Sequence, residues 1–403
     1  MAVDEAKPKA GLEDVVAATS SICYLDGDRG VLAYYGYDIH DLAKGATFEE
    51  TCYLLWHGRL PNRAELGDLQ SQLAAARPVP ESILRLMKQL PASDGMDMLR
   101  TLTSALGQYD PEVNDSSPQA QYRKAVRLTA QMGSIVATYG RMQAGGGHIQ
   151  PDPALGHAAN FLYMLTGKRP SALETRAFDV SLVLHADHEL NASTFAARVA
   201  AATLTDLHSA VVGAIGALKG PLHGGANAEV MKMLLEIGED APPDRIDDYV
   251  RGKLQRKEKI PGFGHRVYTT EDPRATHLRQ MSRELGTRAG NLKWFDMSER
   301  IEAIVKAEKK LNPNVDFYSA FTSASMRWDM SNHAGVPAFL PRSRDICRRW
   351  VARGSSVLYT RWPKPEIFSL RASLPRTNSS MRSPLAVWPR SRSIFITSAL
   401  APP

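Results

Sequence analysis

The stretch that decides the fold is Gly220-Pro221-Leu222-His223-Gly224-Gly225-Ala226-Asn227. It follows a run rich in Ala, Val and Leu, from about Thr194 to Leu218, that has the spacing of one long buried helix. Its apolar positions, three or four residues apart, are Leu204, Leu207, Val211, Ile215 and Leu218. Because Pro cannot continue a helix and Gly permits a turn, the helix is expected to end at Gly220. A second apolar run, Val230 to Ile237, predicts another helix after the turn.

His223 lies inside this turn, among residues small enough to let a ligand approach the backbone. The N–H groups at the start of the following helix would favour an anion or a developing oxyanion. The alternative is a helix hairpin that carries an incidental histidine, and this stretch alone leaves both interpretations open.

The composition indicates an ordinary protein rather than a membrane or disulfide-rich one. A chain of 403 residues can bury a large core and divide into two or more domains. Its three cysteines, Cys23, Cys52 and Cys347, are too scattered for a disulfide framework or a metal cluster, which favours a reducing compartment. The N-terminal residues lack the apolar core of a signal peptide, and no run is long enough to span a bilayer. We therefore expect a cytoplasmic protein without a membrane partner.

The net charge of +6 comes from the C-terminal part of the chain. From Ser323 onward there are twelve Arg and one Lys against three acidic residues, a formal charge of +10, which leaves −4 for residues 1–322. The basic balance is therefore no evidence that the body of the protein binds nucleic acid, and no nucleic-acid partner is expected.

In chain order, the pattern predicts an all-α fold after one β-hairpin. Ile22–Leu25 and Val31–Tyr35 favour strands, and Asp26-Gly27-Asp28-Arg29-Gly30 between them favours a turn. Gly145-Gly146-Gly147 is expected to be a flexible loop, since no strand precedes it and no Lys-Ser/Thr follows. Helices are expected over 39–42, 48–57 with Thr47 as its cap, 157–165, 171–185, 242–259 and 298–311, with a further one opened by Pro61.

Three polar groups interrupt the apolar pattern. The segment from Val183 to Thr194 gathers ionisable residues between two apolar helices, so it is either a surface loop or a site. Zinc is not expected there, because His185 and His188 are three residues apart rather than four and no third ligand stands out. Metal binding is therefore not predicted.

The second group, Pro261 to Tyr268, repeats the arrangement of glycines followed by a histidine, His265. Arg266 and Arg274 follow it and could hold carboxylates or phosphates through two hydrogen bonds each. The third group is Asp316 in an apolar run, where a carboxylate is liable to the raised pKa that suits a general base. Its alternative role is a helix cap.

Taken together, five stretches resemble the citrate synthase family in order and spacing, over roughly Gly11 to Ala320. They are residues 184–194, 220–227, 261–268, 272–274 and 314–319, and residues 26–30 and 34–39 resemble the N-terminus of the shorter bacterial and archaeal members. The resemblance implies an all-α homodimer whose smaller domain closes over the active site. On that pattern residues 11–223 form the large helical domain and residues 224–321 the small one.

The resemblance also implies roles for three residues in condensing acetyl-CoA with oxaloacetate to give citrate and CoA, the entry step of the tricarboxylic acid cycle. His223 would hydrogen-bond the thioester carbonyl as acetyl-CoA enolises, and Asp316 would remove the methyl proton. His265 would polarise the ketone of oxaloacetate so that the enol attacks it. An enolate forms readily only where its oxygen is stabilised, which agrees with these roles.

Binding residues are implied in the same way. His188 and Arg274 would bind oxaloacetate, and a loop would bind the adenine of coenzyme A: Ile260, Pro261, Gly262, Phe263 and Gly264. Acetyl-CoA is then a co-substrate, and no permanently bound cofactor is expected. Nothing in these motifs separates acetyl-CoA from propionyl-CoA, the substrate of 2-methylcitrate synthase, since one methylene is worth only ~1–3 kcal/mol in a pocket.

Two departures bear on activity. Thr269 stands where the family usually has Lys, which would weaken phosphate contacts. After Ala320 the family's Ser-Arg and Arg-Pro segments are not recognisable, and residues 322–403 are rich in Arg, Ser and Pro without a helical or alternating period. That tail can be interpreted as a basic, disordered RNA-binding segment or as translation in a shifted frame, and the abrupt end of the resemblance favours the second. An inactive homologue is thus the alternative to an active condensing enzyme.

Overall fold

The computed structural model describes residues 20–220, 223, 226–265 and 267–325. Within this part the chain forms fifteen α-helices and one small sheet, so the expected all-α class is confirmed. No helix among the described residues is long and apolar enough to cross a membrane. The predicted tail over 322–403 lies almost entirely outside the described residues.

The N-terminal hairpin forms as predicted. Strand β1 (Cys23–Asp26) pairs antiparallel with β2 (Val31–Tyr34), with Cys23 opposite Tyr34. A third strand that the sequence pattern did not predict, β3 (Tyr37–Asp38), pairs with β2. Its two residues are too few to show a period of alternation.

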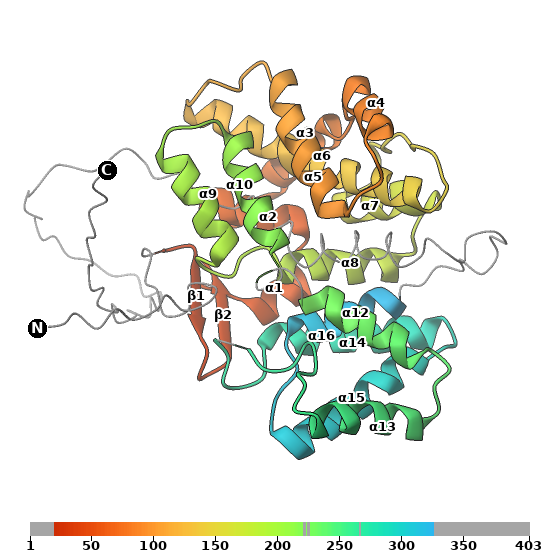
Figure 1. The fold of residues 1–403 in the computed structure, drawn as a ribbon. Coiled ribbons are helices and arrows are strands. Elements are labelled where there is room, and N and C mark those ends of the chain that lie inside the picture. The colour runs from red at the N-terminus through yellow and green to blue at the C-terminus, as the bar shows by residue number, and fades with distance from the viewer. Residues whose placement is uncertain (1–19, 221–222, 224–225, 266, 326–403) are drawn as a thin grey trace, which may run out of the picture. The chain divides into compact units, whose positions relative to one another are not determined.

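The helices of the first part of the chain, residues 39–219, include those predicted over 48–57, 157–165 and 171–185, which lie close to their expected positions (Figure 1). They are α1 (Ile39–Gly45), α2 (Phe48–His57), α3 (Arg63–Ala76), α4 (Glu81–Gln89), α5 (Gly95–Leu106), α6 (Pro118–Gln143), α7 (His157–Thr166), α8 (Ala172–Leu184), α9 (Ala192–Ala202) and α10 (Leu207–Lys219), with a short 3₁₀ turn η2 (Gly107–Tyr109) after α5. The helices of the second part are α12 (Ala226–Ile237), α13 (Pro243–Gln255), α14 (Pro273–Arg288), α15 (Lys293–Lys309) and α16 (Val315–Ser325).

Local chemistry explains where these helices begin. Thr47 caps α2 as predicted, and Glu50 completes a capping box with it. Helix α3 begins after Asn62 rather than at Pro61, because the Asn62 side chain accepts a hydrogen bond from the Glu65 N–H.

The single long helix expected from Thr194 to Leu218 is wrong. The chain forms two helices, α9 and α10, separated at residues 203–206. Leu204, which the pattern placed on a buried face, has a positive φ of 62° and is 87% exposed. Asp206 then caps α10 by accepting from the Ser209 N–H at 2.9 Å. The run of alanines hid the break, since Ala favours helix everywhere and marks no face.

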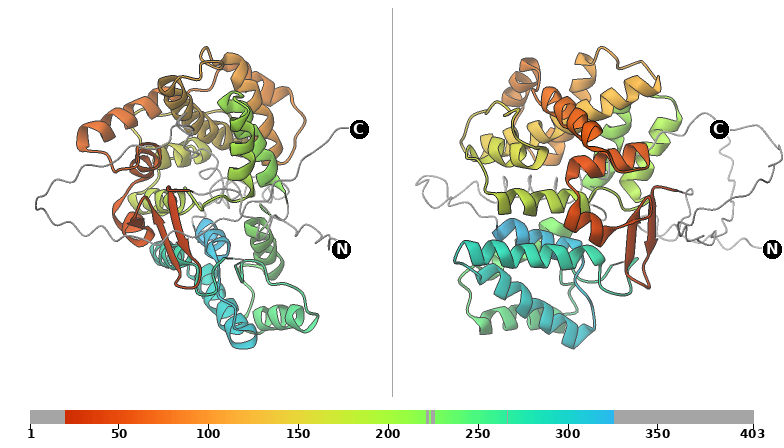
Figure 2. Two further views of the ribbon diagram at one scale, coloured as in Figure 1. Left: turned by 90° about the vertical axis from the view of Figure 1, so that its left-hand side faces the viewer. Right: turned by 180° about the vertical axis from the view of Figure 1, so that it is seen from behind.

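The second part of the chain is held together by its own helices. Helix α16 packs on α12, α14 and α15, and α13 packs on α15. Helix α14 also packs on α8 and α1 of the first part, an arrangement that Figures 1 and 2 show from three sides. The expected division into domains 11–223 and 224–321 stays a prediction, because all described residues belong to one compact unit.

Candidate active site

His223 is joined to the first turn of α9. The Ser193 N–H, one of the amides that a helix N-terminus leaves without an intrahelical partner, donates to His223 Nε2 at 3.2 Å. The Ser193 hydroxyl lies 2.9 Å from the same nitrogen and 2.7 Å from Asn191 Oδ1. The amide N–H favours the tautomer with the ring proton on Nδ1, whereas the hydroxyl, whose own proton goes to Asn191, faces Nε2 with a lone pair and favours a proton on Nε2. The two contacts therefore hold Nε2 of His223 at the start of α9 and leave its tautomer open.

Asn227 links the His223 segment to Asp316. It lies on α12 with 1% of its surface exposed, four residues after His223. Its Nδ2 donates to the carbonyl oxygen of Asp316 at 3.3 Å and to the Ser319 hydroxyl at 2.5 Å. The first turn of α16 is therefore held against the start of α12, and two candidate residues far apart in sequence come from adjoining helix ends.

Asn314 connects Asp316 to the loop predicted to bind coenzyme A. Its Oδ1 accepts from the Asp316 N–H at 3.0 Å and the Phe317 N–H at 3.3 Å, so Asn314 caps α16. The capping role weighed for Asp316 is therefore wrong, and its half-buried carboxylate is not needed for that purpose. Asn314 also donates from Nδ2 to the carbonyl oxygen of Gly264 at 3.0 Å.

The loop from Ile260 to Gly264 has a conformation that glycine requires. Gly262 and Gly264 have φ of +81° and +70°. A Cβ on Gly262 would lie 2.7 Å from Phe317 Cβ, and the Asn314 N–H donates to the Gly262 carbonyl at 2.9 Å. Because α16 packs this closely, no side chain larger than hydrogen fits at residue 262.

His265 has its proton placed by the backbone that follows it. The N–H groups of Val267 and Tyr268 lie 3.0 Å and 3.3 Å from His265 Nδ1. Nδ1 is then the acceptor, and Nε2 carries the proton of the neutral ring. Burial, reinforced by the charge of Arg274, lowers the pKa of His265 to about 4. At neutral pH the ring is thus an uncharged hydrogen-bond donor through Nε2.

Arg274 lies in a buried ion pair at the start of α14. Its Nε and Nη2 each donate to the Asp272 carboxylate at 2.9 Å, and the two residues are 4% and 1% exposed. Burial alone would raise the pKa of Asp272, but the Arg274 guanidinium holds it well below its usual range. Asp272 also accepts from the Val315 N–H at 3.0 Å, which ties α14 to the start of α16.

His188 lies beside His265, with the ring centroids 5.4 Å apart. Its Nε2 is 3.3 Å from the hydroxyl of Tyr268, a residue that is 4% exposed. Burial, and then the neighbouring Arg274 and His265, lower the pKa of His188 well below its usual value. The segment around His188 is thus part of the candidate site rather than an independent surface loop.

Hydrogen bonds hold the predicted residues in separate groups, with His223 at Ser193, Asp316 at Asn227 and Asn314, and His188 and His265 at Tyr268. Three other residues that the sequence singled out lie apart from these groups or outside the described residues. His185 is buried and directs Nδ1 at the Ser181 carbonyl, 2.7 Å away, at the end of α8. Arg266 lies outside the described residues. Thr269 binds the N-terminal hairpin, with its hydroxyl 2.9 Å from Asp28 Oδ1.

Sequence reasoning missed residues that hold the others in place: Ser193, Asn227, Tyr268, Asp272 and Asn314. Ser193 and Asn314 could have been found as polar residues at predicted helix starts. The links made by Asn227 and Tyr268 join segments far apart in the chain and leave no local signal.

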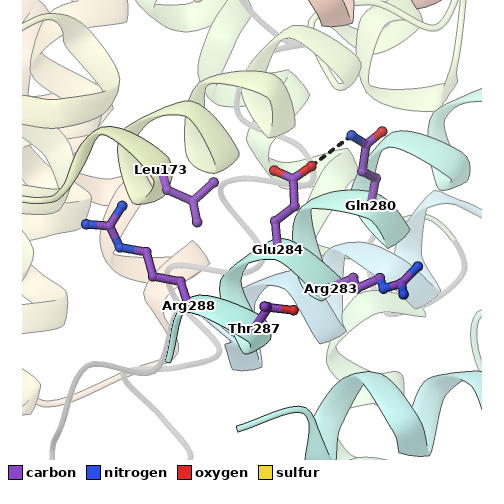
Figure 3. Close-up of a pocket in the computed structure, with 6 residues that line it drawn as sticks. All are labelled: Leu173, Gln280, Arg283, Glu284, Thr287 and Arg288. Atoms are coloured by element: carbon purple, nitrogen blue, oxygen red, sulfur yellow. Dashed lines mark hydrogen bonds between the residues drawn. The ribbon is translucent and has the colours of Figure 1, made fainter. Parts of the chain in front are cut away.

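Two open hollows lie elsewhere on the surface. One of about 680 Å³ is formed by α14 and the start of α8 (Figure 3), and its lining residues are Leu173, Gln280, Arg283, Glu284, Thr287 and Arg288. The other, of about 460 Å³, lies against α13 and α15. Neither is lined by a candidate site residue.

The site combines groups suited to carbonyl chemistry. Two imidazoles, that of His265 with its proton on Nε2 and that of His223 held at Nε2 by the start of α9, can donate to carbonyl or enolate oxygens. A carboxylate at the first turn of α16 can accept a proton, and a buried guanidinium can bind a carboxylate. This set fits proton abstraction beside a carbonyl, followed by attack of the resulting enol.

Comparison with known proteins agrees with this chemistry. The sequence matches the family described as "Citrate synthase, C-terminal domain" over residues 11–339, so the match extends beyond Ala320, where the resemblance was expected to end. Citrate synthase 2 of Bacillus subtilis is 53% identical over 321 residues, 79% of this chain and 85% of that protein. The 2-methylcitrate synthase of Shewanella oneidensis is 41% identical over 350 residues, 85% of this chain and 89% of that protein.

Solved structures agree as well. The ternary complex of carboxymethyl coenzyme A and oxaloacetate with citrate synthase from Thermoplasma acidophilum is 27% identical, with a TM-score of 0.77 over 92% of this chain and 97% of that one. The fold and the sequence therefore agree: the chain belongs to the citrate synthase family and is an acyltransferase of the citrate synthase type.

Proposed function

We propose that the enzyme condenses acetyl-CoA with oxaloacetate and hydrolyses the product to citrate and free CoA. The proposal rests on the backbone amides that contact one nitrogen of each ring, which favours His223 as a donor through Nδ1 and His265 as a donor through Nε2. Two uncharged donors suit two carbonyl oxygens, that of the thioester and that of the ketone.

The proposed sequence begins at Asp316. Its carboxylate takes a proton from the acetyl methyl group while the Nδ1–H of His223 binds the thioester oxygen, which gains charge as the enol forms. The methyl carbon then bonds to the ketone carbon of oxaloacetate as the C=O π bond breaks, and the ketone oxygen takes the Nε2 proton of His265 to become the citrate hydroxyl. The proton held by Asp316 passes to solvent, from which the His265 ring regains its own. Water finally cleaves the citryl-CoA thioester, which releases citrate and the CoA thiol.

His188 and Arg274 are proposed to bind the oxaloacetate carboxylates. The Arg274 side chain is already desolvated and fixed by Asp272, so little order is lost when a carboxylate approaches. The loop from Ile260 to Gly264 is proposed to bind coenzyme A, supported by its glycine-dependent backbone and its hydrogen bonds to Asn314. Acetyl-CoA is a substrate, and no permanent cofactor is proposed.

Propionyl-CoA is the alternative acyl donor, which would make the product 2-methylcitrate. The similarity to the Shewanella oneidensis 2-methylcitrate synthase favours testing it. Steady-state turnover with each acyl-CoA, followed by release of the CoA thiol, decides between the two. If kcat/KM for propionyl-CoA exceeds that for acetyl-CoA, propionyl-CoA replaces acetyl-CoA as the proposed substrate.

The substrate assignment is tested with Arg274→Lys in a grafted chain, in which residues 1–339 continue into the corresponding C-terminal residues of the Bacillus subtilis relative. Lys keeps the charge near Asp272 but cannot hold a carboxylate through two parallel hydrogen bonds. We expect KM for oxaloacetate to rise about tenfold or more, and KM for acetyl-CoA to change little. Equal changes in both constants would show that Arg274 does not bind oxaloacetate.

We propose that the enzyme forms a homodimer in which α9 and α10 contact the partner subunit. Helix α9 contains one charged residue, Arg198, yet Val199 is 52% exposed. On α10 a Cβ at Gly213 or Gly216 would meet nothing within 4 Å, which leaves room for a partner helix to approach closely. An exposed apolar face of this kind is typical of a contact between subunits.

Light scattering on the grafted chain tests the dimer. Gly213→Glu introduces a charge and bulk on the outer face of α10, so we expect a shift from dimer to monomer. Gly67→Glu is the control, because Gly67 is also exposed on a helix with open space around it. A dimer that survives Gly213→Glu would exclude this face.

We also propose a cytoplasmic location, in keeping with the small number of cysteines.

A further inference from the structure

Tyr268 touches all three side chains proposed to bind oxaloacetate. Its hydroxyl lies 3.3 Å from His188 Nε2. Its ring centroid is 4.9 Å from that of His265, and the Arg274 guanidinium carbon lies 5.9 Å from the same centroid. With 4% of its surface exposed, Tyr268 is a buried residue that packs against all three side chains of the candidate site.

The backbone that carries Tyr268 is held on both sides. On one side its own N–H and that of Val267 donate to His265 Nδ1. On the other side the Thr269 N–H donates to the Gly27 carbonyl at 3.1 Å, in the turn between β1 and β2. The phenol therefore projects from a segment with little freedom to shift, as a group that orients its neighbours must.

We propose that Tyr268 is a positioning residue, whose hydroxyl donates to Nε2 of His188 and so fixes that ring with its proton on Nδ1. A neutral imidazole has one N–H and one lone pair, and its unprotonated nitrogen is a better acceptor than a phenol oxygen. Burial, the main cause, raises the pKa of Tyr268, so the phenol keeps the proton it donates. His188 then presents Nδ1–H to a substrate carboxylate.

The ring of Tyr268, as distinct from its hydroxyl, contacts Arg274. Its face lies near the Arg274 guanidinium, whose hydrogen bonds to Asp272 leave little room for reorientation. The hydroxyl and the ring can thus be separated by mutation: Tyr268→Phe removes only the hydroxyl, and Tyr268→Leu removes the ring as well. The consequence for substrate rests on the proposed function, in which His188 and Arg274 bind oxaloacetate.

The first experiment needs no substrate. The 403-residue chain is labelled with ¹⁵N-histidine, and the His188 ring signals are assigned by their loss in His188→Asn. We expect Nε2 of His188 to show the shift of an unprotonated nitrogen in the unsubstituted chain, and a changed tautomer balance in Tyr268→Phe. Unchanged His188 signals in Tyr268→Phe would overturn the proposal. Thermal unfolding checks that the variant is folded.

The second experiment measures oxaloacetate and acetyl-CoA binding by calorimetry. Loss of one buried hydrogen bond should weaken oxaloacetate binding by about 3- to 10-fold in Tyr268→Phe and more in Tyr268→Leu, with acetyl-CoA binding unchanged. Tyr139→Phe is the matched control, since the hydroxyl of the buried Tyr139 bonds to the backbone of Ser93, accepting from its N–H at 3.0 Å and donating to its carbonyl at 2.7 Å, and lies apart from the candidate site. Oxaloacetate binding that is equal in Tyr268→Phe and Tyr139→Phe would also overturn the proposal.

The two experiments separate this inference from the proposed function. If the unsubstituted chain and the grafted chain both fail to bind oxaloacetate, the substrate assignment is wrong. The His188 signals still decide whether Tyr268 sets the tautomer.

Discussion

Two histidines of the site are contacted at one ring nitrogen by backbone amides. Ser193 donates to His223 from the open end of α9, and Val267 and Tyr268 donate to His265 from the chain that follows it. A backbone amide can only donate, so each amide contact favours an unprotonated nitrogen at that position. In that tautomer each ring presents its N–H in a fixed direction, and little reorganisation is needed when charge develops on a substrate oxygen.

Asp316 is the proposed base, and its removal gives the first prediction. In the grafted chain, Asp316→Asn should keep oxaloacetate binding within about twofold and lower kcat by ~10²–10⁴, since the amide cannot accept the methyl proton. The control is Asp296→Asn, which changes an exposed acidic residue in the first turn of α15. Calorimetry and a thiol-release assay measure the two quantities, and near-normal turnover in Asp316→Asn would remove Asp316 from the mechanism.

A buried carboxylate outside the site gives a prediction on pH. Burial, and then the charge of Glu49, raise the pKa of Asp179 to about 7, although the carboxylate accepts from the Phe48 N–H and pairs with Arg176. The folded protein therefore binds this proton more tightly than the unfolded chain, whose Asp pKa is ~3.9. Stability contributed by the protonated group is present at low pH and is lost as the pH rises through 4 to 7.

Asp179→Asn removes this titration. The unsubstituted chain loses this stability as the pH rises and the variant does not, so we expect the variant's free energy of unfolding minus that of the unsubstituted chain to increase between pH 5 and 8. Urea unfolding at several pH values measures this difference, with Asp97→Asn, a half-buried partner of Lys219, as the control. A difference that stays constant with pH would contradict the raised pKa.

The sequence could predict which residues carry chemistry at this site but not how they are held. His223, His265 and Asp316 stand out because ionisable residues between apolar helices need a reason to be there. Asn227 and Asn314 do not stand out, since their importance depends on which helix end each one faces. That information exists only after α12 and α16 have packed together.

At the scale of elements, the helix boundaries follow from local chemistry where a polar cap is present. Thr47 and Asn62 mark the starts of their helices. Asp206 caps α10 in the same way, but the alanines before it and the apolar spacing through Leu204 and Leu207 hid the break between α9 and α10. The hairpin was predictable from its turn residues, but its contact with the His265 segment was not, because residues 27 and 269 are far apart in the chain.

That contact gives a prediction for Gly27. A Cβ there would lie 1.9 Å from the Val267 carbonyl oxygen, so Gly27→Ala must displace the hairpin turn or the segment that places the His265 proton. We expect a loss of stability of about 1–3 kcal/mol and weaker oxaloacetate binding. Gly67→Ala is the control, since it lies inside α3 with open space around it and should be neutral or stabilise by ~0.5–1 kcal/mol. Urea unfolding and calorimetry measure both effects, and a silent Gly27→Ala would show that the turn does not support the site.

At the scale of the whole molecule, the site depends on contacts between distant parts of the chain. Ser193 from the first part binds His223, while α14 connects Arg274 both to α16 and, through its packing, to α8 and α1. If the domain closure implied by the family resemblance occurs, α14 moves against α8 and α1. The family match ends at residue 339, so any part of the site that family members build from later residues has no recognised counterpart in this chain.

The final prediction concerns those residues. We expect the 403-residue chain to fold over the described part but to release CoA at least tenfold more slowly than the grafted chain. The proposed catalytic trio is present in both, so the chemistry of His223, His265 and Asp316 does not differ. What differs is the segment after residue 339, in which the carboxylate-binding arginine expected from the family pattern is not recognisable. A dianion in a desolvated pocket needs charged partners, and losing one weakens its binding in both the ground and the transition state.

The measurement is thiol release by the two chains at equal concentration, with circular dichroism to confirm that both are folded. Equal rates would mean that residues 340–403 of this chain supply their own partner for the substrate, and Arg→Ala scanning of that segment would then locate it.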